Sequence, residues 1–196
     1  MKVAIVYNHP YSGSFCNAIL HSVLAGIAKS GHEADVFNLD EEGFNPVMTA
    51  ADLKAFVMQK PVDLQVLAYH ERLKEADHLV FIFPIWWELM PALTKGFIDK
   101  VIFPGLAYAH PKNSLKMTPL LTNLKRVTVI STMNTPSWLY RILFGNAIRK
   151  AMMVGTFWKI GFKNRKWISL TQVKSATHAK RRKWLDRIEE RFTKLK

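Results

Sequence analysis

The sequence is poor in cysteine and in long apolar runs. Its 196 residues include a single cysteine, Cys16, so no intramolecular disulfide can form, and no Cys/His spacing is typical of a zinc site. The longest apolar stretch, residues 79–87, is far shorter than the ~20 residues that cross a bilayer, and the apolar run after Lys2 is too short for a signal peptide. These absences predict a soluble, cytoplasmic protein with no metal site and no membrane insertion.

Acidic residues are scarce relative to basic ones. The chain has 28 Lys and Arg against 15 Asp and Glu, a formal charge of +13, and such an excess is typical of proteins with an anionic partner. Thirteen of the basic residues and three of the acidic ones lie in residues 159–196. There Leu185, Ile188, Phe192 and Leu195 keep a helical spacing. This pattern favours an amphipathic helix with a solvated basic face over a nucleic-acid site.

Short apolar runs alternate with amphipathic stretches along the chain, which is typical of βαβ units around a parallel sheet. No internal repeat or linker is present, and the length suits one domain over residues 1–196. We expect an α/β three-layer sandwich of the flavodoxin-like kind, with a five-stranded parallel sheet in the order 2-1-3-4-5. The expected strands are residues 3–7, 34–39, 78–83, 127–130 and 167–170. The expected helices run from Ser12 or Ser14 to about Ser30, over 49–76 with a break at Pro61, over 91–101 and 137–153, and from 176 to the end, with a long loop after 101.

Ligands of such sheets lie beyond the carboxyl ends of the strands, which here are followed by three polar or aromatic loops. The first, residues 8–17, leads into a helix and carries His9, Ser12 and Ser14, whose side chains and neighbouring N–H groups suit phosphate oxygens. It is neither a Walker A sequence nor a GxGxxG fingerprint, which disfavours nucleotide hydrolysis and a Rossmann-type NAD site. An ordinary polar turn with a helix cap explains the same residues.

Two tryptophans, Trp86 and Trp87, occur in the second loop, residues 84–91. Flat indoles suit stacking against a planar ring, and packing on the next helix or at a subunit interface explains them equally well. The third loop, residues 131–137, offers hydroxyl, amide and backbone donors for the polar edge of a heterocycle. The plainer alternative for Ser137 is the N-cap of the following helix.

Three segments together carry a resemblance to a known family. They are His9-Pro10 with Ser14-Phe15, the run from Phe83 to Val101 that contains both tryptophans, and Gly105-Leu106-Ala107-Tyr108. In these segments the chain resembles the NAD(P)H:quinone oxidoreductase family, the DT-diaphorase-like branch of the flavodoxin-like flavoproteins. The order of elements matches over about residues 2–190, and the short bacterial members of the family have this length.

The resemblance implies a non-covalently bound FAD or FMN, NAD(P)H as the electron donor and a quinone or similar acceptor. It implies that hydride passes from NAD(P)H through flavin N5 to the acceptor, and that the protein forms a homodimer without a nucleic-acid partner. The alternative is a flavin-containing ancillary subunit of a potassium efflux system, a role that some relatives have. The positions assigned to flavin binding are His9, Ser12, Ser14, Phe15, Asn17, Pro84, Ile85, Trp86, Trp87, Ser131, Thr132 and Asn134.

The chain departs from the family pattern at three places. Ser131-Thr132-Met133-Asn134 stands where many members have Thr-Thr-Gly-Gly, and Cys16 stands where an asparagine is frequent. Tyr140 matches a tyrosine that assists hydride transfer in some relatives, so the resemblance assigns it that role. Gly145-Asn146 stands where the accompanying histidine would fall, so no histidine is assigned.

Overall fold

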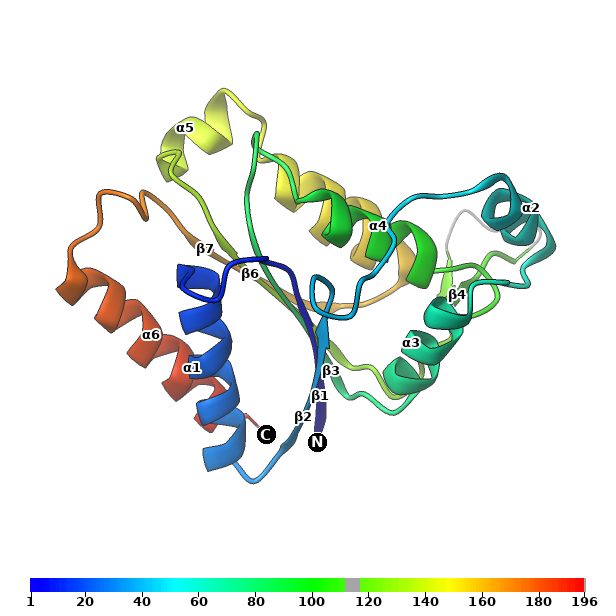
Figure 1. The fold of residues 1–196 in the computed structure, drawn as a ribbon, viewed down its shortest axis with the longest axis horizontal. Coiled ribbons are helices and arrows are strands. Elements are labelled where there is room, and N and C mark those ends of the chain that lie inside the picture. Colours follow the sequence, from blue (N-terminus) through cyan, green and yellow to red (C-terminus); the bar gives the residue numbers. More distant parts are fainter. Residues whose placement is uncertain (112–116, 196) are drawn as a thin grey trace.

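Five parallel strands form the central sheet of the protein (Figure 1). The computed structural model describes residues 1–111 and 117–195. The strand order is β2-β1-β3-β6-β7, and every neighbouring pair is parallel. Numbered within this sheet alone, that is the order 2-1-3-4-5, so the predicted flavodoxin-like sandwich is confirmed. The strands are β1 (Lys2–Tyr7), β2 (Glu33–Asn38), β3 (His78–Pro84), β6 (Arg126–Thr132) and β7 (Asn164–Leu170).

Helices cover both faces of this sheet (Figure 1). On one face lie α1 (Phe15–Lys29) and α6 (His178–Thr193), and on the other lie α3 (Leu64–Lys74), α4 (Ala92–Val101) and the π-helix η1 (Arg149–Trp158). Because successive side chains of a strand point to opposite faces and both faces are covered, the inner strands β1 and β3 are apolar at nearly every position. Within the described residues, no helix combines the length and apolar character needed to cross a membrane.

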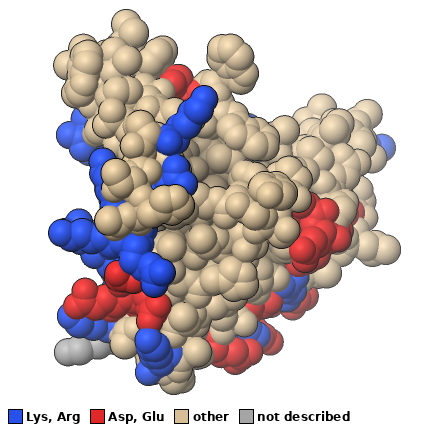
Figure 2. Space-filling view, turned by 60° about the vertical axis from the view of Figure 1, so that its left-hand side comes forward, with Lys and Arg blue, Asp and Glu red and all other residues tan. Residues whose placement is uncertain are grey.

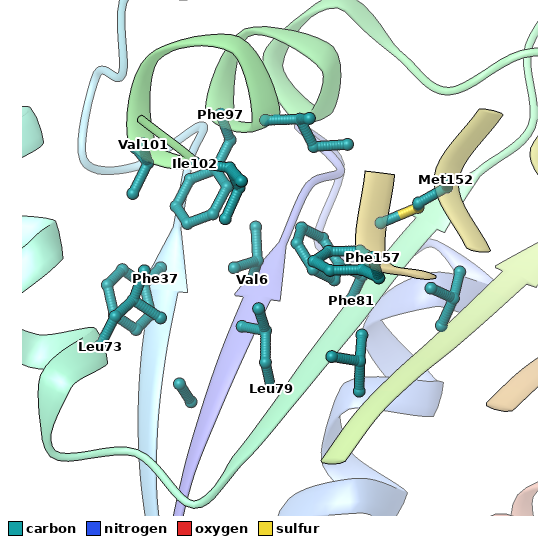
Figure 3. Packing of buried hydrophobic residues seen from close by; sticks show 14 of the residues in the cluster. Val6, Phe37, Leu73, Leu79, Phe81, Phe97, Val101, Ile102, Met152 and Phe157 are labelled. Carbon is teal, nitrogen blue, oxygen red and sulfur yellow. The ribbon is translucent and has the colours of Figure 1, made fainter. Parts of the chain in front are cut away.

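The larger apolar core lies between the sheet and helices α4 and η1 (Figure 3). Phe81 of β3 contacts Phe97 of α4 and Phe157 of η1, with ring centroids 5.8 Å and 5.6 Å apart. These three side chains and the neighbouring Leu79 are completely buried. Burial of each such side chain contributes roughly 2 kcal/mol. The middle of the sheet is therefore a rigid base for the loops that follow its strands.

The segment between β2 and β3 contains two helices, as the break at Pro61 predicts. The first, α2 (Ala50–Met58), begins with a capping box in which Thr49 and Asp52 each bond the other's backbone N–H. The second, α3, has Asp63 as its N-cap, and the Asp63 carboxylate accepts hydrogen bonds from two backbone N–H groups of the first turn.

The predicted long loop after α4 is partly structured. It contains a short antiparallel ribbon formed by β4 (Tyr108–Ala109) and β5 (Thr118–Pro119). Gly105, just before this ribbon, has a left-handed φ of 81°, which a glycine adopts without strain. Residues 112–116 of the predicted loop lie outside the described residues.

The prediction of one helix over residues 137–153 is wrong. Helix α5 (Ser137–Ile142) ends after six residues, and the chain becomes helical again at residue 147, directly before η1. Between them Gly145 and Asn146 have left-handed φ angles of 61° and 57°. Gly-Asn is a typical turn pair, and a backbone in this conformation cannot continue a right-handed helix.

Two prolines are helix N-caps, although the sequence predicted a first-turn position for one and a serine cap in place of the other. Pro91 is the N-cap of α4 and not a residue of its first turn, and Pro136 is the N-cap of α5, so Ser137 is the first helical residue and not the cap. Neither proline offers a side-chain acceptor to the free N–H groups of the first turn.

Helix α6 packs against α1 through a close contact at Gly26. A Cβ atom at this position would lie 2.5 Å from the carbonyl oxygen of Glu189, so a larger residue would push the helices apart. Ile188 and Phe192 are buried on the inner side of α6, as their spacing predicts. Lys and Arg side chains gather on the side of the molecule where α6 lies (Figure 2).

His78, the first residue of β3, is buried in a neutral form. Its Nε2 atom lies 2.8 Å from Thr128 Oγ1, and its ring stacks on Phe192 with an interplanar angle of 8°. Burial, together with the charge of Arg126, lowers the pKa of His78 to about 3. The pKa of an unfolded histidine is about 6.5, so between these values the unfolded chain binds a proton that the folded protein does not. The stabilisation is therefore complete above the unfolded pKa and is lost as the pH falls below it.

We expect acidification from pH 7 to pH 5 to lower the free energy of unfolding by about 2 kcal/mol through His78. Urea unfolding at both pH values measures this change. In His78→Gln, whose amide can still bond Thr128, most of this pH dependence should disappear. His21→Gln removes an exposed histidine of α1 and serves as the control. Equal pH dependence in wild type and His78→Gln would contradict the assignment.

Candidate functional site

The loops after β1, β3 and β6 meet at the carboxyl edge of the sheet. The backbone N–H of Asn8 donates to the carbonyl of Ile82 at 3.0 Å, which joins the first loop to β3. The backbone N–H of Ile85 donates to the carbonyl of Thr132 at 2.7 Å, which joins the second loop to β6. The three loops predicted to bind a ligand are therefore neighbours.

The first loop and the start of α1 line a depression of about 450 Å³. Ser14 is the N-cap of α1, and its Oγ accepts a hydrogen bond from the backbone N–H of Asn17 at 3.1 Å. The N-terminus of a helix presents free N–H groups with a partial positive charge, which favours phosphate. Of the predicted residues, His9, Ser12 and Asn17 line this depression.

Tyr7 also lines the depression and was not predicted as a site residue. Its hydroxyl is buried beside the Ser14 and Asn17 side chains, but it completes no hydrogen bond with well-formed geometry among the described residues. Burial raises the pKa of Tyr7, so the hydroxyl stays protonated and can donate. An unpaired buried polar group costs about 1–3 kcal/mol, which an acceptor oxygen of a ligand would remove. The signal in the sequence was its place at the carboxyl end of a buried strand.

Acidic residues line another part of this depression. Asp40 accepts a hydrogen bond from Asn8 Nδ2 at 2.8 Å, and Asn8 Oδ1 accepts one from Thr94 Oγ1 at 2.9 Å. Glu41 lines the depression as well. Carboxylates repel phosphate but accept hydrogen bonds from hydroxyl groups. The depression therefore suits a ligand that carries both phosphate and hydroxyl groups better than a free anion.

His9 connects the first loop to the second. Its ring meets that of Trp86 edge-on, with centroids 6.2 Å apart. Its Nδ1 accepts a hydrogen bond from the backbone N–H of Tyr11 at 3.1 Å, which leaves the proton of the neutral ring on Nε2. Burial lowers the pKa of His9, which favours this neutral form with one free donor.

The second loop turns sharply at Trp87 and Glu88. Trp86 and Leu89 exchange two backbone hydrogen bonds, of 2.9 Å and 3.0 Å, and the two residues between them have left-handed φ angles of 49° and 63°. Turns of this kind usually contain Asn-Gly, and larger side chains there cost roughly 1–2 kcal/mol each. The turn holds the Trp87 side chain 97% exposed. Backbone strain of this kind is concentrated at functional sites.

Glu88 ties the second loop to the third. Its Oε1 accepts a hydrogen bond from Thr135 Oγ1 at 2.6 Å, and its carbonyl accepts one from the Tyr140 hydroxyl at 2.9 Å. The Tyr140 hydroxyl itself accepts the backbone N–H of Ile148 at 2.9 Å. In this structure Tyr140 supports the strained turn, and the role of Tyr140 in hydride transfer stays a prediction.

Four of the predicted positions bond or pack elsewhere. Ser131 is completely buried, and its Oγ accepts the indole N–H of Trp167 at 2.9 Å. Asn134 Oδ1 accepts the backbone N–H of Lys174 at 3.0 Å, and Phe15 packs against an indole of α6. Pro84 is buried at the end of β3. The predicted residues that the structure brings to the three meeting loops are His9, Ser12, Ser14, Asn17, Ile85, Trp86, Trp87 and Thr132.

Comparison with known families agrees with this architecture. Residues 1–192 match the family described as having a flavodoxin-like fold. The chain belongs to this flavodoxin-like family. The predicted resemblance to the NAD(P)H:quinone oxidoreductase branch is confirmed by the relatives.

Relatives with related names match part of the chain. The uncharacterized NAD(P)H oxidoreductase YcaK of Escherichia coli is 33% identical over 125 residues, which are 61% of this chain and 64% of that protein. The ribosyldihydronicotinamide dehydrogenase [quinone] of Rattus norvegicus is 26% identical over 126 residues, 56% of this chain and 54% of that protein. The matches thus span between about half and two thirds of the length of these curated relatives.

Solved structures match over the whole chain. One of them is the NAD(P)H:quinone oxidoreductase from Methanothermobacter marburgensis, which has a TM-score of 0.89 and 25% identity. The match covers 100% of this chain and 99% of that one. The arrangement of strands and helices is therefore shared from end to end.

We expect Trp87→Asn to raise the free energy of unfolding by about 1 kcal/mol, because asparagine tolerates the left-handed conformation and the exposed indole packs on little. Urea denaturation measures the change. Trp87→Ala removes the same indole but keeps the strain, so it should gain clearly less. If the alanine variant is as stable as the asparagine variant, strain at this position is not the cause.

Proposed function

We propose that this protein is an oxidoreductase that binds FMN or FAD non-covalently at the carboxyl edge of the sheet. When bound, the flavin would accept a hydride from NAD(P)H and pass it to a quinone or a similar acceptor. The proposal rests on one observation above all: the unpaired, buried Tyr7 hydroxyl beside the N-terminus of α1. The names of the relatives, which are NAD(P)H oxidoreductases and quinone dehydrogenases, support the same chemistry.

The first loop would hold the phosphate and the ribityl chain. Tyr7 and Ser12 supply hydroxyl donors, and the neutral His9 ring supplies an N–H donor. The free N–H groups at the start of α1, behind the Ser14 cap, favour the negative charge of a phosphate. Asp40 supplies an acceptor for ligand hydroxyl groups.

The second and third loops would hold the ring system. Ile85, Trp86 and Trp87 offer apolar and flat surfaces. The two indoles are exposed to water, and a flavin ring stacked on them would shield them. The Thr132 hydroxyl lies 3.4 Å from Cys16 Sγ. Burial raises the pKa of Cys16 to about 11, so the thiol stays protonated and does not act as a nucleophile. The residues thus bind and orient, and electron transfer is left to the cofactor.

The proposed assembly is a homodimer that covers the apolar surface beside this site. Ile142 and Leu143 are 78% and 68% exposed at the end of α5, and Trp138 on the same helix is 64% exposed. Large apolar side chains gathered on one exposed segment are typical of interfaces. Helix α5 also contains Tyr140, whose hydroxyl supports the strained turn of the second loop, so this exposed segment adjoins the candidate site.

We expect Ser12→Asp to weaken flavin binding at least tenfold, because a new carboxylate in the depression repels the phosphate. Fluorescence titration of the flavin-free protein with FMN and with FAD measures both affinities. Thr122→Asp adds the same charge to an exposed loop before β6, at the opposite edge of the sheet, and should bind within twofold of wild type. Failure of the unaltered protein to bind either flavin would refute the proposed function.

A turnover assay distinguishes the proposed enzyme from the alternative, an ancillary subunit of a transporter. The flavin-loaded enzyme should be bleached by NADH or NADPH without oxygen and reoxidised by a quinone, as followed in the visible spectrum. Tight flavin binding with negligible turnover, together with co-purification of a membrane transporter, would instead favour the subunit of a potassium efflux system.

For the homodimer, we expect light scattering at micromolar concentration to give twice the mass of the chain. Leu143→Glu should shift the protein to the monomer, because burial of an unpaired carboxylate at an interface is costly. Leu120→Glu makes the same change at a half-exposed leucine near the opposite edge and should leave the mass unchanged. A monomeric wild-type protein would contradict the assembly.

A further inference from the structure

A second concave site lies at the amino edge of the sheet, opposite the candidate flavin site. It has a volume of about 620 Å³ and is formed by the first residues of β3, β6 and β7 and by the last turns of α6. Ligand pockets in proteins usually measure about 300–1,000 Å³. The pocket is therefore large enough for a small organic or inorganic ligand, and it shares no lining residue with the depression at the carboxyl edge.

The charge of this pocket is strongly positive. Five cationic side chains and one carboxylate line it: Arg126, Lys166, Arg187, Arg191, Lys194 and Glu190. Glu190 pairs with Lys194 at 2.5 Å. The other four cations have no carboxylate within ion-pair distance among the residues that the structure describes. Unpaired like charges around one concavity repel each other and raise the local concentration of anions.

Buried polar groups form the inner wall of the pocket. His78 and Thr128 line it and are only 2% and 4% exposed. His78 Nε2 bonds Thr128 Oγ1, whereas His78 Nδ1 is buried without a partner among the described residues. With Thr128 as the donor to Nε2, the neutral ring carries its proton on Nδ1 and has a donor to offer. Such a group costs free energy until an acceptor reaches it.

The shape of the site favours a small anion over a nucleic acid. The aromatic ring in the lining, Phe192, is 1% exposed and stacked on His78, so it offers no platform for bases. Recognition of single strands uses exposed aromatic rings along a basic groove. Here the cations surround a pocket instead.

We propose that this pocket binds a small phosphate-bearing ligand with at least two negative charges. Arg126 and Lys166 from the sheet and Arg187 and Arg191 from α6 would surround the phosphate oxygens, with His78 Nδ1 as a further donor. The site is independent of the proposed flavin site, because it is built from the other ends of the strands.

Isothermal titration calorimetry of the full chain with inorganic pyrophosphate tests this proposal. We expect saturable one-to-one binding with a micromolar dissociation constant at low ionic strength. The double variant Arg126→Gln/Arg191→Gln should bind at least tenfold more weakly. The double variant Arg182→Gln/Lys183→Gln removes the same charge from exposed residues of α6 outside the pocket and should stay within twofold of wild type.

Two further readouts separate this site from its alternatives. In Ser12→Asp, pyrophosphate binding should persist, because the altered residue lies at the opposite edge. The imidazole NMR signals of His78 should shift with the same dissociation constant as the calorimetric titration. Thermal melting of each variant confirms that it is folded, and flavin affinity unchanged in Arg126→Gln/Arg191→Gln confirms that the two sites are separate.

Several results would overturn the proposal. Equal weakening in both double variants would mean general attraction to a basic surface. Loss of binding in Ser12→Asp but not in Arg126→Gln/Arg191→Gln would place the anion at the first loop. Binding of a DNA duplex with micromolar affinity, without saturable binding of pyrophosphate, would assign the basic surface to nucleic acid instead.

Discussion

Parallel pairing of β1, β3 and β6 is the constraint on which the candidate site depends. Because all strands run the same way, their carboxyl ends and the loops that follow them share one edge. The backbone bonds from Asn8 to Ile82 and from Ile85 to Thr132 carry this register into the loops themselves. If one of these strands were antiparallel, its following loop would lie at the other edge, and the proposed ring and phosphate subsites would no longer be neighbours.

The sequence predicted the strands and the loops that converge, because these features depend on burial and topology. Strands covered on both faces appear as uninterrupted apolar runs, and a doubly wound order implies which loops converge. The end of α5 after Ile142 was missed because it depends on a left-handed Gly145-Asn146 turn that helical periodicity obscures. The Tyr7 hydroxyl was missed because a lack of hydrogen-bond partners is a property of three-dimensional surroundings, and Tyr7 itself appears in the sequence as a strand residue.

Strain and support are balanced at the aromatic turn. Trp87 and Glu88 adopt a backbone conformation that their side chains disfavour, and the turn persists because Glu88 is bonded from the third loop by Thr135 and from α5 by Tyr140. The bonds that hold the turn come from residues 47 and 52 positions away. Local sequence alone would not predict this turn, and the proposed flavin site offers a reason for keeping an indole exposed there.

The contact of α1 with α6 at Gly26 also constrains the order of events during synthesis. One side of the sheet is covered by α1 and by α6, and Ile188 and Phe192 of α6 complete the core over Val80, Ile82 and Ile130. A nascent chain that has all five strands but has not yet released α6 from the ribosome would expose this face to water. Such a chain would present apolar surface to chaperones and to other nascent chains until α6 emerges.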